Sequence, residues 1–228
     1  MSLAAPAIPP PTLLLTRPEP AARRFAAAAA PLGLPVLISP VLRIVPVPHD
    51  AGRLAAARGL VFTSVHAVPA AGAGRGRPAI CVGPATARAA REAGFAVTEG
   101  PGDAARMLPM LQGLGPGWLH PHGAHVAKVL PVPGVVVYDQ LPQELSPAAR
   151  ALLAGPGPVI LPLFSPRSAR LLAGQAGEAR AALWLVPISA AAAAAWRGPF
   201  ARVAVAADPD AGGVLAAIET LLGAEQSM

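Results

Sequence analysis

Small polar residues and glycines follow the short apolar runs of this chain at intervals along its length. They occur at Thr16-Arg17, Thr63-Ser64, Gly83 with Thr86, His120 to Gly123, Ser165 to Ser168, Ser189 and Asp208. Each set precedes a stretch typical of a helix, and a helix N-terminus offers free N–H groups and a favourable dipole to carboxylates or phosphates. At any one position, helix capping worth about 1 kcal/mol is the better explanation. Because the same pattern of small polar residues follows several apolar runs, it favours an anion-binding site in addition to capping.

Three histidines lie close together in the sequence, as His120, His122 and His125. This spacing could hold a metal ion, but no cysteine or carboxylate lies close enough to complete a site. Pro121 and Gly123 favour a loop. We therefore expect a solvated loop and no metal. The sequence also lacks a dinucleotide fingerprint, a P-loop and a nucleophile elbow.

Tyr138 is the only tyrosine of the chain and follows the apolar run Val135 to Val137. Its phenol could point into a space between two lobes and act on a ligand there. Its ring could equally pack a hinge while the hydroxyl stays in contact with water. The sequence favours neither interpretation.

The 228 residues carry a net charge of +6, from 18 basic and 12 acidic side chains. The arginines are spread from Arg17 to Arg202 without a dense basic run or an accompanying group of aromatic residues. Nucleic-acid binding typically uses basic patches and stacking platforms, so this distribution does not favour it. We expect a small polyanionic ligand, no nucleic-acid partner and a monomer.

The single cysteine, Cys81, lies in an apolar run and is expected to be a buried, reduced thiol. The longest apolar stretch, Ala181 to Trp196, has 16 residues and contains Pro187, whereas spanning a bilayer takes about 20. The N-terminus lacks the basic region of a signal peptide. We therefore expect a cytoplasmic protein without membrane contact.

Apolar runs that predict strands alternate with Ala- and Arg-rich stretches that predict helices. The predicted strands are 13–15, 60–63, 79–82, 95–98, 118–120, 159–163, 183–186 and 203–206. Helices are predicted at 21–32, after Ser64 and at 85–93. Because the apolar runs are continuous rather than alternating, we expect parallel strands covered on both faces, which makes the fold class α/β.

The order of elements after Ser64 recurs, weakly, after Ser165, which predicts two copies of one α/β design. The β-rich segments 34–44 and 134–141 lie between the copies and predict a two-stranded β connector. We expect two flavodoxin-like lobes with parallel sheets. Lobe 1 would hold residues 1–35 and 143–228, lobe 2 residues 46–132, and the β-ladder linker residues 36–45 and 133–142.

Six segments stand out in order along the chain: TRPEPAARRF, LVFTSVHAV, ICVGPATARAAREAG, VVVYDQLP, LFSPRSARLL and VAVAADPD. No single segment is diagnostic, but the ordered set, within Leu13 to Ile218, resembles the uroporphyrinogen-III synthase family. The resemblance implies two α/β lobes joined by a two-stranded β-ladder, with a cleft between the lobes.

The resemblance further implies a cyclising hydro-lyase of tetrapyrrole and heme biosynthesis. Its substrate, hydroxymethylbilane, is a linear tetrapyrrole octacarboxylate that loses its terminal hydroxyl as water and closes to uroporphyrinogen III with the last pyrrole inverted. The pyrrole nitrogens supply the electron push, so no cofactor is implied. Because the free substrate closes without inversion, the enzyme's task is positioning, which can supply about 7–11 kcal/mol.

By motif, Tyr138 corresponds to the family tyrosine suggested to hydrogen-bond the leaving hydroxyl. The residues expected to bind the substrate carboxylates are Arg17, Thr63, Ser64, Gly83, Thr86, Ser165, Ser168 and Ser189. For Arg17, a structural ion pair near the first helix is an equally good explanation.

The chain departs from the family pattern at three places. His66 stands where asparagine is usual, His122 stands where arginine is usual before Gly123, and alanines at 190–194 replace a usual threonine. The loss of a fixed positive charge at His122 leaves an alternative open. The chain could be a weak enzyme, or a non-catalytic two-lobed protein that binds a small anion or a tetrapyrrole.

Overall fold

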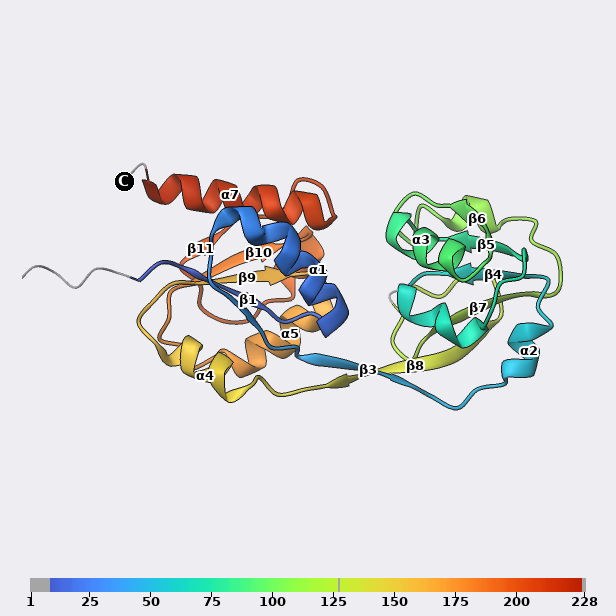
Figure 1. Cartoon of the computed structure of the whole chain (residues 1–228), viewed down its shortest axis with the longest axis horizontal. Coiled ribbons are helices and arrows are strands. Elements are labelled where there is room, and N and C mark those ends of the chain that lie inside the picture. The colour runs from blue at the N-terminus through green and yellow to red at the C-terminus, as the bar shows by residue number, and fades with distance from the viewer. Residues whose placement is uncertain (1–8, 127, 227–228) are drawn as a thin grey trace, which may run out of the picture. The chain divides into compact units, whose positions relative to one another are not determined.

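The computed structural model describes residues 9–126 and 128–226. The chain divides into two compact units, the first made of Met1–Arg43 and Pro142–Met228 and the second of Ile44–Leu141. The second unit is thus inserted into the sequence of the first. Each unit is built on one sheet with helices or turns against it (Figure 1).

The sheet of the first unit has five parallel strands in the order β11-β10-β9-β1-β2. They are β1 (Thr12–Leu15), β2 (Val36–Ile38), β9 (Val159–Leu163), β10 (Leu183–Pro187) and β11 (Arg202–Val203). From β1 the chain adds β2 on one side and β9, β10 and β11 on the other, which is the flavodoxin order. Ligands of such sheets bind where the strand order reverses, here after β1 and β9.

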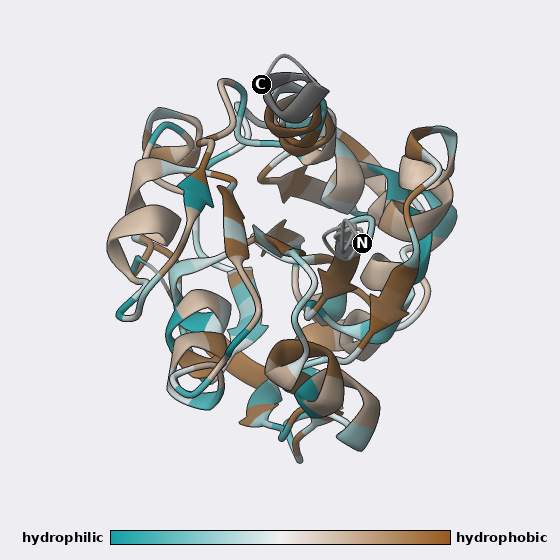
Figure 2. Cartoon of the chain, turned by 90° about the vertical axis from the view of Figure 1, so that its left-hand side faces the viewer, coloured by the Kyte–Doolittle hydropathy of each residue, from teal (hydrophilic) through white to brown (hydrophobic). Residues whose placement is uncertain are grey.

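Helices cover both faces of this sheet (Figure 1). One face carries α1 (Glu19–Ala29), which continues as the 3₁₀ turn η1 (Ala30–Leu32), and α7 (Ala211–Gln226). The other carries α4 (Pro147–Ala154), α5 (Pro166–Gln175) and α6 (Ala190–Ala194). Successive strand side chains point to opposite faces, so Leu14 packs with α4 to α6 while Leu13 and Leu15 pack with α1 and α7. Hydrophobic strands between these helices are visible in Figure 2.

The second sheet has six strands in the order β3-β8-β7-β4-β5-β6. They are β3 (Leu42–Pro46), β4 (Gly59–Phe62), β5 (Pro78–Cys81), β6 (Ala96–Glu99), β7 (Trp118–Gly123) and β8 (Gly134–Pro142). The strands from β4 to β8 are parallel. Numbered along the chain, these five follow the order 3-2-1-4-5, so this sheet reverses between β4 and β7. The α/β class and the two parallel-dominated sheets are as the sequence predicts.

The faces of the second sheet are covered more lightly. One face carries α2 (Ala51–Ala55), the 3₁₀ turns η2 (Val65–Ala67) and η3 (Pro69–Ala71), and α3 (Pro84–Glu92), whereas the segment around the 3₁₀ turn η4 (Leu108–Leu111) lies on the other. The helix predicted after Ser64 is therefore two short turns. Pro69 cannot donate a backbone hydrogen bond, and Gly72 ends the second turn at φ +63°.

Three local expectations differ from the structure. Residues 36–38, expected in the connector, form β2 and pair with β1, with Val36 opposite Leu13. Of the strand predicted at 203–206, only residue 203 is in a strand, because β11 ends there. The histidine segment is not a loop: His120 and His122 lie in β7. Pro121 is tolerated because β4 pairs with β7 only as far as Leu119, and β7 is paired with β8 alone at this point.

No helix in the described part of the chain is long and apolar enough to cross a membrane.

Candidate functional site

In the first unit, the loops after β1 and β9 hold Arg17 against an aromatic ring. The guanidinium carbon of Arg17 lies 3.9 Å from the ring centroid of Phe164. Phe25 of α1 meets Phe164 edge to face, with centroids 5.0 Å apart. The cation–π contact, supported from behind by a second ring, fixes the guanidinium at the reversal point of the sheet.

Arg17 has no counter-ion among the residues that the structure describes. None of the ion pairs found among the described residues involves it, and its buried Nε has no hydrogen-bond partner there. Burial, and secondly the nearby Arg24, lower the pKa of Arg17 to about 10, so the group stays charged at neutral pH. A buried donor without a partner costs about 1–3 kcal/mol, and an anion would remove that cost. The structural ion pair considered for Arg17 is not present in the part of the chain that the structure describes.

Of the three serines predicted to bind in the first unit, two act as helix caps. Ser165 and Ser189 are the N-caps of α5 and α6, and their hydroxyl oxygens accept from Ser168 N at 3.1 Å and from Ala192 N at 3.3 Å. Ser168 is buried, and its hydroxyl donates to the carbonyl of Ser165 at 3.1 Å. The capping interpretation is confirmed for Ser165 and Ser189, and these caps hold the loops after β9 and β10 in place.

In the second unit, the loop after β4 meets the two histidines of β7. Thr63 Oγ1 lies 3.0 Å from His120 Nε2, and the rings of His120 and His122 are 4.8 Å apart. His120 is buried, and burial together with the neighbouring His122 lowers its pKa to about 4, so it is neutral at pH 7. The half-buried His122 donates from Nδ1 to the carbonyl of Gly123 at 2.7 Å. Because a carbonyl only accepts, the proton of neutral His122 is on Nδ1, and Nε2 is the nitrogen that can gain one.

Tyr138 of β8 is buried, with 5% of its surface exposed. Its ring packs on the backbone of Gly123, where a Cβ would lie 2.5 Å from Cε2 of the tyrosine. The ring of His66, in η2, meets it edge to face at 5.8 Å. Within the described residues the Tyr138 hydroxyl has no hydrogen-bond partner. The ring is thus a packing element of the second unit, while the hydroxyl is not committed to a structural bond.

The remaining predicted residues lie on neighbouring loops of the same edge. Ser64 is the N-cap of η2 and accepts from His66 N at 3.3 Å. Gly83 is the N-cap of α3 and passes close to Gly102, because a Cβ on Gly83 would lie 3.1 Å from Gly102 Cα. Thr86 is buried in the first turn of α3. Since β4 and β5 are paired in parallel, both loops follow the carboxyl ends of adjacent strands.

Each predicted residue therefore lies at the carboxyl edge of the sheet of its own unit. Two further residues of the candidate site, Phe164 and His120, were not predicted from the sequence as site residues. Phe164 gave no signal, because only the pairing of β1 with β9 brings it to Arg17. His120 was predicted as the last residue of the strand 118–120 and also as part of a solvated histidine loop, and nothing in the sequence indicated its contact with Thr63.

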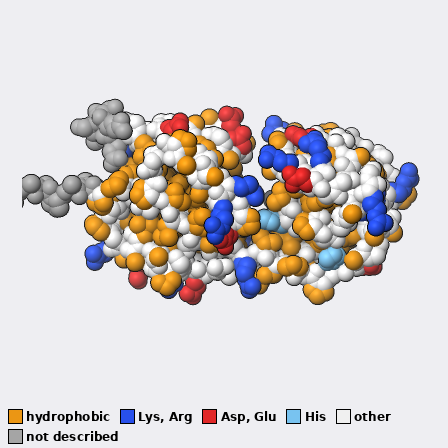
Figure 3. All heavy atoms as spheres, in the orientation of Figure 1, with side chains coloured by type: hydrophobic (Ala, Val, Ile, Leu, Met, Phe, Trp, Pro, Cys, Tyr) orange, Lys and Arg blue, Asp and Glu red, His pale blue; other side chains and the backbone are white. Residues whose placement is uncertain are grey.

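Other parts of the molecule offer less chemistry. The described residues contain no group of three or more His, Cys, Asp or Glu side chains suited to a metal ion. Cys81 is buried in β5, and burial raises the pKa of its thiol to about 11, which disfavours the reactive thiolate. On the face shown in Figure 3, Lys and Arg side chains lie in separate groups rather than in one patch.

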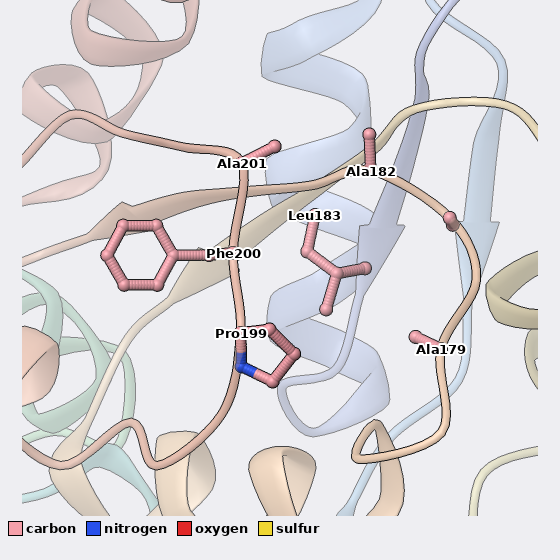
Figure 4. A pocket seen from close by; sticks show the side chains of 7 residues that line it. Ala179, Ala182, Leu183, Pro199, Phe200 and Ala201 are labelled. Atoms are coloured by element: carbon pink, nitrogen blue, oxygen red, sulfur yellow. The ribbon is translucent and has the colours of Figure 1, made fainter.

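An apolar pocket lies at the opposite, amino-terminal edge of the first sheet (Figure 4). It is lined by Ala179, Ala181, Ala182, Leu183, Pro199, Phe200 and Ala201. These side chains offer no charge or hydrogen bond to a carboxylate. We therefore place the candidate site at the carboxyl edges and not here.

Comparisons with known proteins agree with this fold. The family model described as Uroporphyrinogen-III synthase HemD matches residues 23–216. A uroporphyrinogen-III synthetase structure from Helicobacter pylori shares 15% identity over 92% of this chain and 99% of that chain, with a TM-score of 0.62. A mutant uroporphyrinogen III synthase structure from Thermus thermophilus shares 18% identity over 96% of this chain and 100% of that chain, with a TM-score of 0.53. No curated protein sequence matches the chain.

At such identities the two structures show a common fold and no more. The family model, in contrast, spans well over half of the sequence. The chain belongs to the uroporphyrinogen-III synthase HemD family.

Proposed function

We propose that this protein is a uroporphyrinogen-III synthase, which closes hydroxymethylbilane to uroporphyrinogen III with loss of water and inversion of the last pyrrole ring. Family membership supports a tetrapyrrole as the substrate class. The structural observation that carries the proposal is Arg17, a desolvated cation without a counter-ion among the described residues, at the reversal point of the first sheet. Such a group suits a ligand that brings its own carboxylates.

Binding rests on Arg17 and on the starts of the helices. Arg17, whose guanidinium lies over the ring of Phe164, donates hydrogen bonds to one carboxylate of the substrate. Ser165, Ser168 and Ser189 shape the loops whose backbone N–H groups face the end of the sheet. Thr63, Ser64, Gly83 and Thr86 play the same part in the second unit. Together, the contacts of these loops and of Arg17 with the substrate carboxylates fix the position of the flexible tetrapyrrole.

The chemistry begins with loss of the terminal hydroxyl. The lone pair of the adjacent pyrrole nitrogen pushes out the C–O bond, and the oxygen takes up a proton and leaves as water. The hydroxyl of Tyr138 donates a hydrogen bond to this oxygen as negative charge develops on it. Ring closure then depends on which carbon of the last pyrrole is held against the new electrophile, so selectivity is a matter of position.

The test is a product-isomer assay with the purified protein and hydroxymethylbilane generated in situ by the preceding enzyme. We expect type III product in large excess over type I. Formation of type I alone, at the rate seen without protein, would contradict the synthase and leave the non-catalytic alternative. That alternative is then examined by measuring binding of the octacarboxylate product.

A further inference from the structure

Strand β8 contains a β-bulge directly before Tyr138. The pairing of β7 with β8 runs in regular steps up to His122, which lies opposite Val136. The next residue of β7, Gly123, lies opposite Tyr138 and not opposite Val137, so β8 carries one extra residue at this step. Bulges are rare between parallel strands, and beside active sites they commonly re-aim a side chain.

The bulge changes the face of the sheet to which Tyr138 points. Successive residues of a strand normally point to opposite faces. Val135 and Val137 are buried in the core that η2 and α3 cover, whereas Val136, between them, is 41% exposed. Regular alternation would turn Tyr138 to the side of Val136, but its ring is buried in the same core as Val137. The extra residue therefore lets two consecutive side chains share one face.

Gly123 provides the space that the redirected ring occupies. A Cβ at Gly123 would lie 2.5 Å from Cε2, 2.6 Å from Cζ and 3.0 Å from the hydroxyl oxygen of Tyr138. The φ of Gly123 lies outside the left-handed region, so the backbone would accept a side chain and the ring is what opposes one. Because Gly123 is the last residue of β7, the phenol oxygen lies beside the carboxyl end of that strand.

We propose that the bulge in β8 and Gly123 of β7 together position the hydroxyl of Tyr138. The bulge sets the face to which the ring points, and the glycine lets the ring lie against the end of β7. Gly123 is thus a positioning residue, which acts through Tyr138 and contacts no reacting atom itself. That the hydroxyl assists the reaction rests on the proposed function, whereas its placement by Gly123 does not.

The experiment compares Gly123→Ala with Gly59→Ala in the full chain. A Cβ at Gly59 would lie 2.6 Å from the ring of Trp118, so the control creates the same kind of clash in the same sheet. Gly59 and Trp118 are the first residues of β4 and β7, and the control clash is therefore at the opposite edge from Tyr138.

NMR gives a readout of the ring itself. Because Tyr138 is the only tyrosine, incorporated fluorotyrosine labels one residue. We expect its fluorine signal to shift in Gly123→Ala and to stay at the wild-type position in Gly59→Ala. In the unmutated chain, nuclear Overhauser effects should join the ring protons of Tyr138 to the Hα protons of Gly123. Absence of these effects, or an unshifted signal in Gly123→Ala, would overturn the proposal, and the first of these measurements does not depend on the folding of a variant.

Turnover gives the second readout. Gly123→Ala should lower kcat about tenfold to a hundredfold with KM almost unchanged, because the hydroxyl is displaced while the backbone N–H groups remain. In a Tyr138→Phe background the same substitution should cause little further loss, since Gly123 acts through the hydroxyl. Gly59→Ala should keep wild-type turnover. Equal losses from Gly123→Ala with and without the hydroxyl would overturn the positioning role. Since the NMR readouts use no turnover, failure here is distinguishable from failure of the isomer assay.

Discussion

Tyr138 combines a buried ring with a hydroxyl that has no hydrogen-bond partner in the described part of the chain, so its two roles can be separated by removing one atom. In Tyr138→Phe the ring still packs on Gly123, and we expect an unchanged melting temperature and almost unchanged KM. Turnover should fall about tenfold to a hundredfold, at the low end of general-acid effects, because the pyrrole nitrogen already drives departure of the hydroxyl. Wild-type turnover in this variant would assign Tyr138 to packing alone.

For Arg17 we expect the opposite pattern: its replacement should weaken substrate binding and leave the chemical step unchanged. Arg17→Met keeps a long apolar side chain over Phe164 and removes the desolvated charge. We expect substrate affinity to fall about tenfold or more, as for loss of a charge-assisted hydrogen bond. Thermal stability should stay equal or rise, because a buried donor without a partner disappears.

Arg23→Met is the matched control for this substitution. Arg23 lies in α1, is exposed and pairs with Glu19. Its replacement should alter neither affinity nor turnover. Equal losses in both variants would show that general positive charge, and not the position of Arg17, accounts for binding.

Among the elements, β7 contains the buried, neutral His120, and burial of this residue makes the free energy of unfolding depend on pH. The pKa of His120 is lowered to about 4 in the folded state, against an ordinary value near 6.5, so the unfolded chain binds the extra proton first. Stability should therefore fall as pH drops from about 6.5 to 4, by on the order of 3 kcal/mol in total. Denaturant unfolding at several pH values checks this, and a His120→Gln protein with the same slope would contradict it.

Short elements of the second unit depend on one arginine. Arg77 donates to the carbonyls of Leu54 at 2.7 Å and Ala71 at 3.2 Å, which belong to α2 and η3, and its guanidinium lies over Phe95. Arg77→Met removes a donor from both carbonyls, of which that of Leu54 keeps a backbone donor, Ala57 N at 3.3 Å, and should destabilise the unit by about 1–3 kcal/mol. Arg88→Met, on the exposed side of α3, is the control and should change little.

The same elements show what a sequence can reveal. Continuous apolar runs predicted the strands 13–15 and 159–163 closely, because burial on both faces leaves a local pattern. The pairing of β2 with β1 leaves no such pattern in the sequence. Which strands pair depends on contacts between residues far apart in the chain, so β2 was expected in the connector. The candidate residues were found through their place after strands, whereas the stack of Phe164 on Arg17 depends on the pairing of β1 with β9.

For the molecule as a whole, the net charge of +6 predicts salt-dependent binding of an octacarboxylate. Affinity should weaken between low and high ionic strength, but only in part, because the partly buried Arg17 and backbone N–H groups are screened less than exposed arginines. Titration of the tetrapyrrole product at several salt concentrations checks this. A binding constant independent of salt would contradict an electrostatic site.

The insertion of the second unit into the first has a consequence for how the protein is made. During synthesis, β1 emerges first among the described strands, yet its partner β9 is synthesised only after the whole of Ile44–Leu141. The inserted unit is continuous in sequence and can fold on the ribosome before β9, the central strand of the first sheet, has been synthesised. Until Val159–Leu163 appears, the fully buried leucines of β1 have only one neighbouring strand, so a stalled or truncated chain would expose leucines that the complete fold buries.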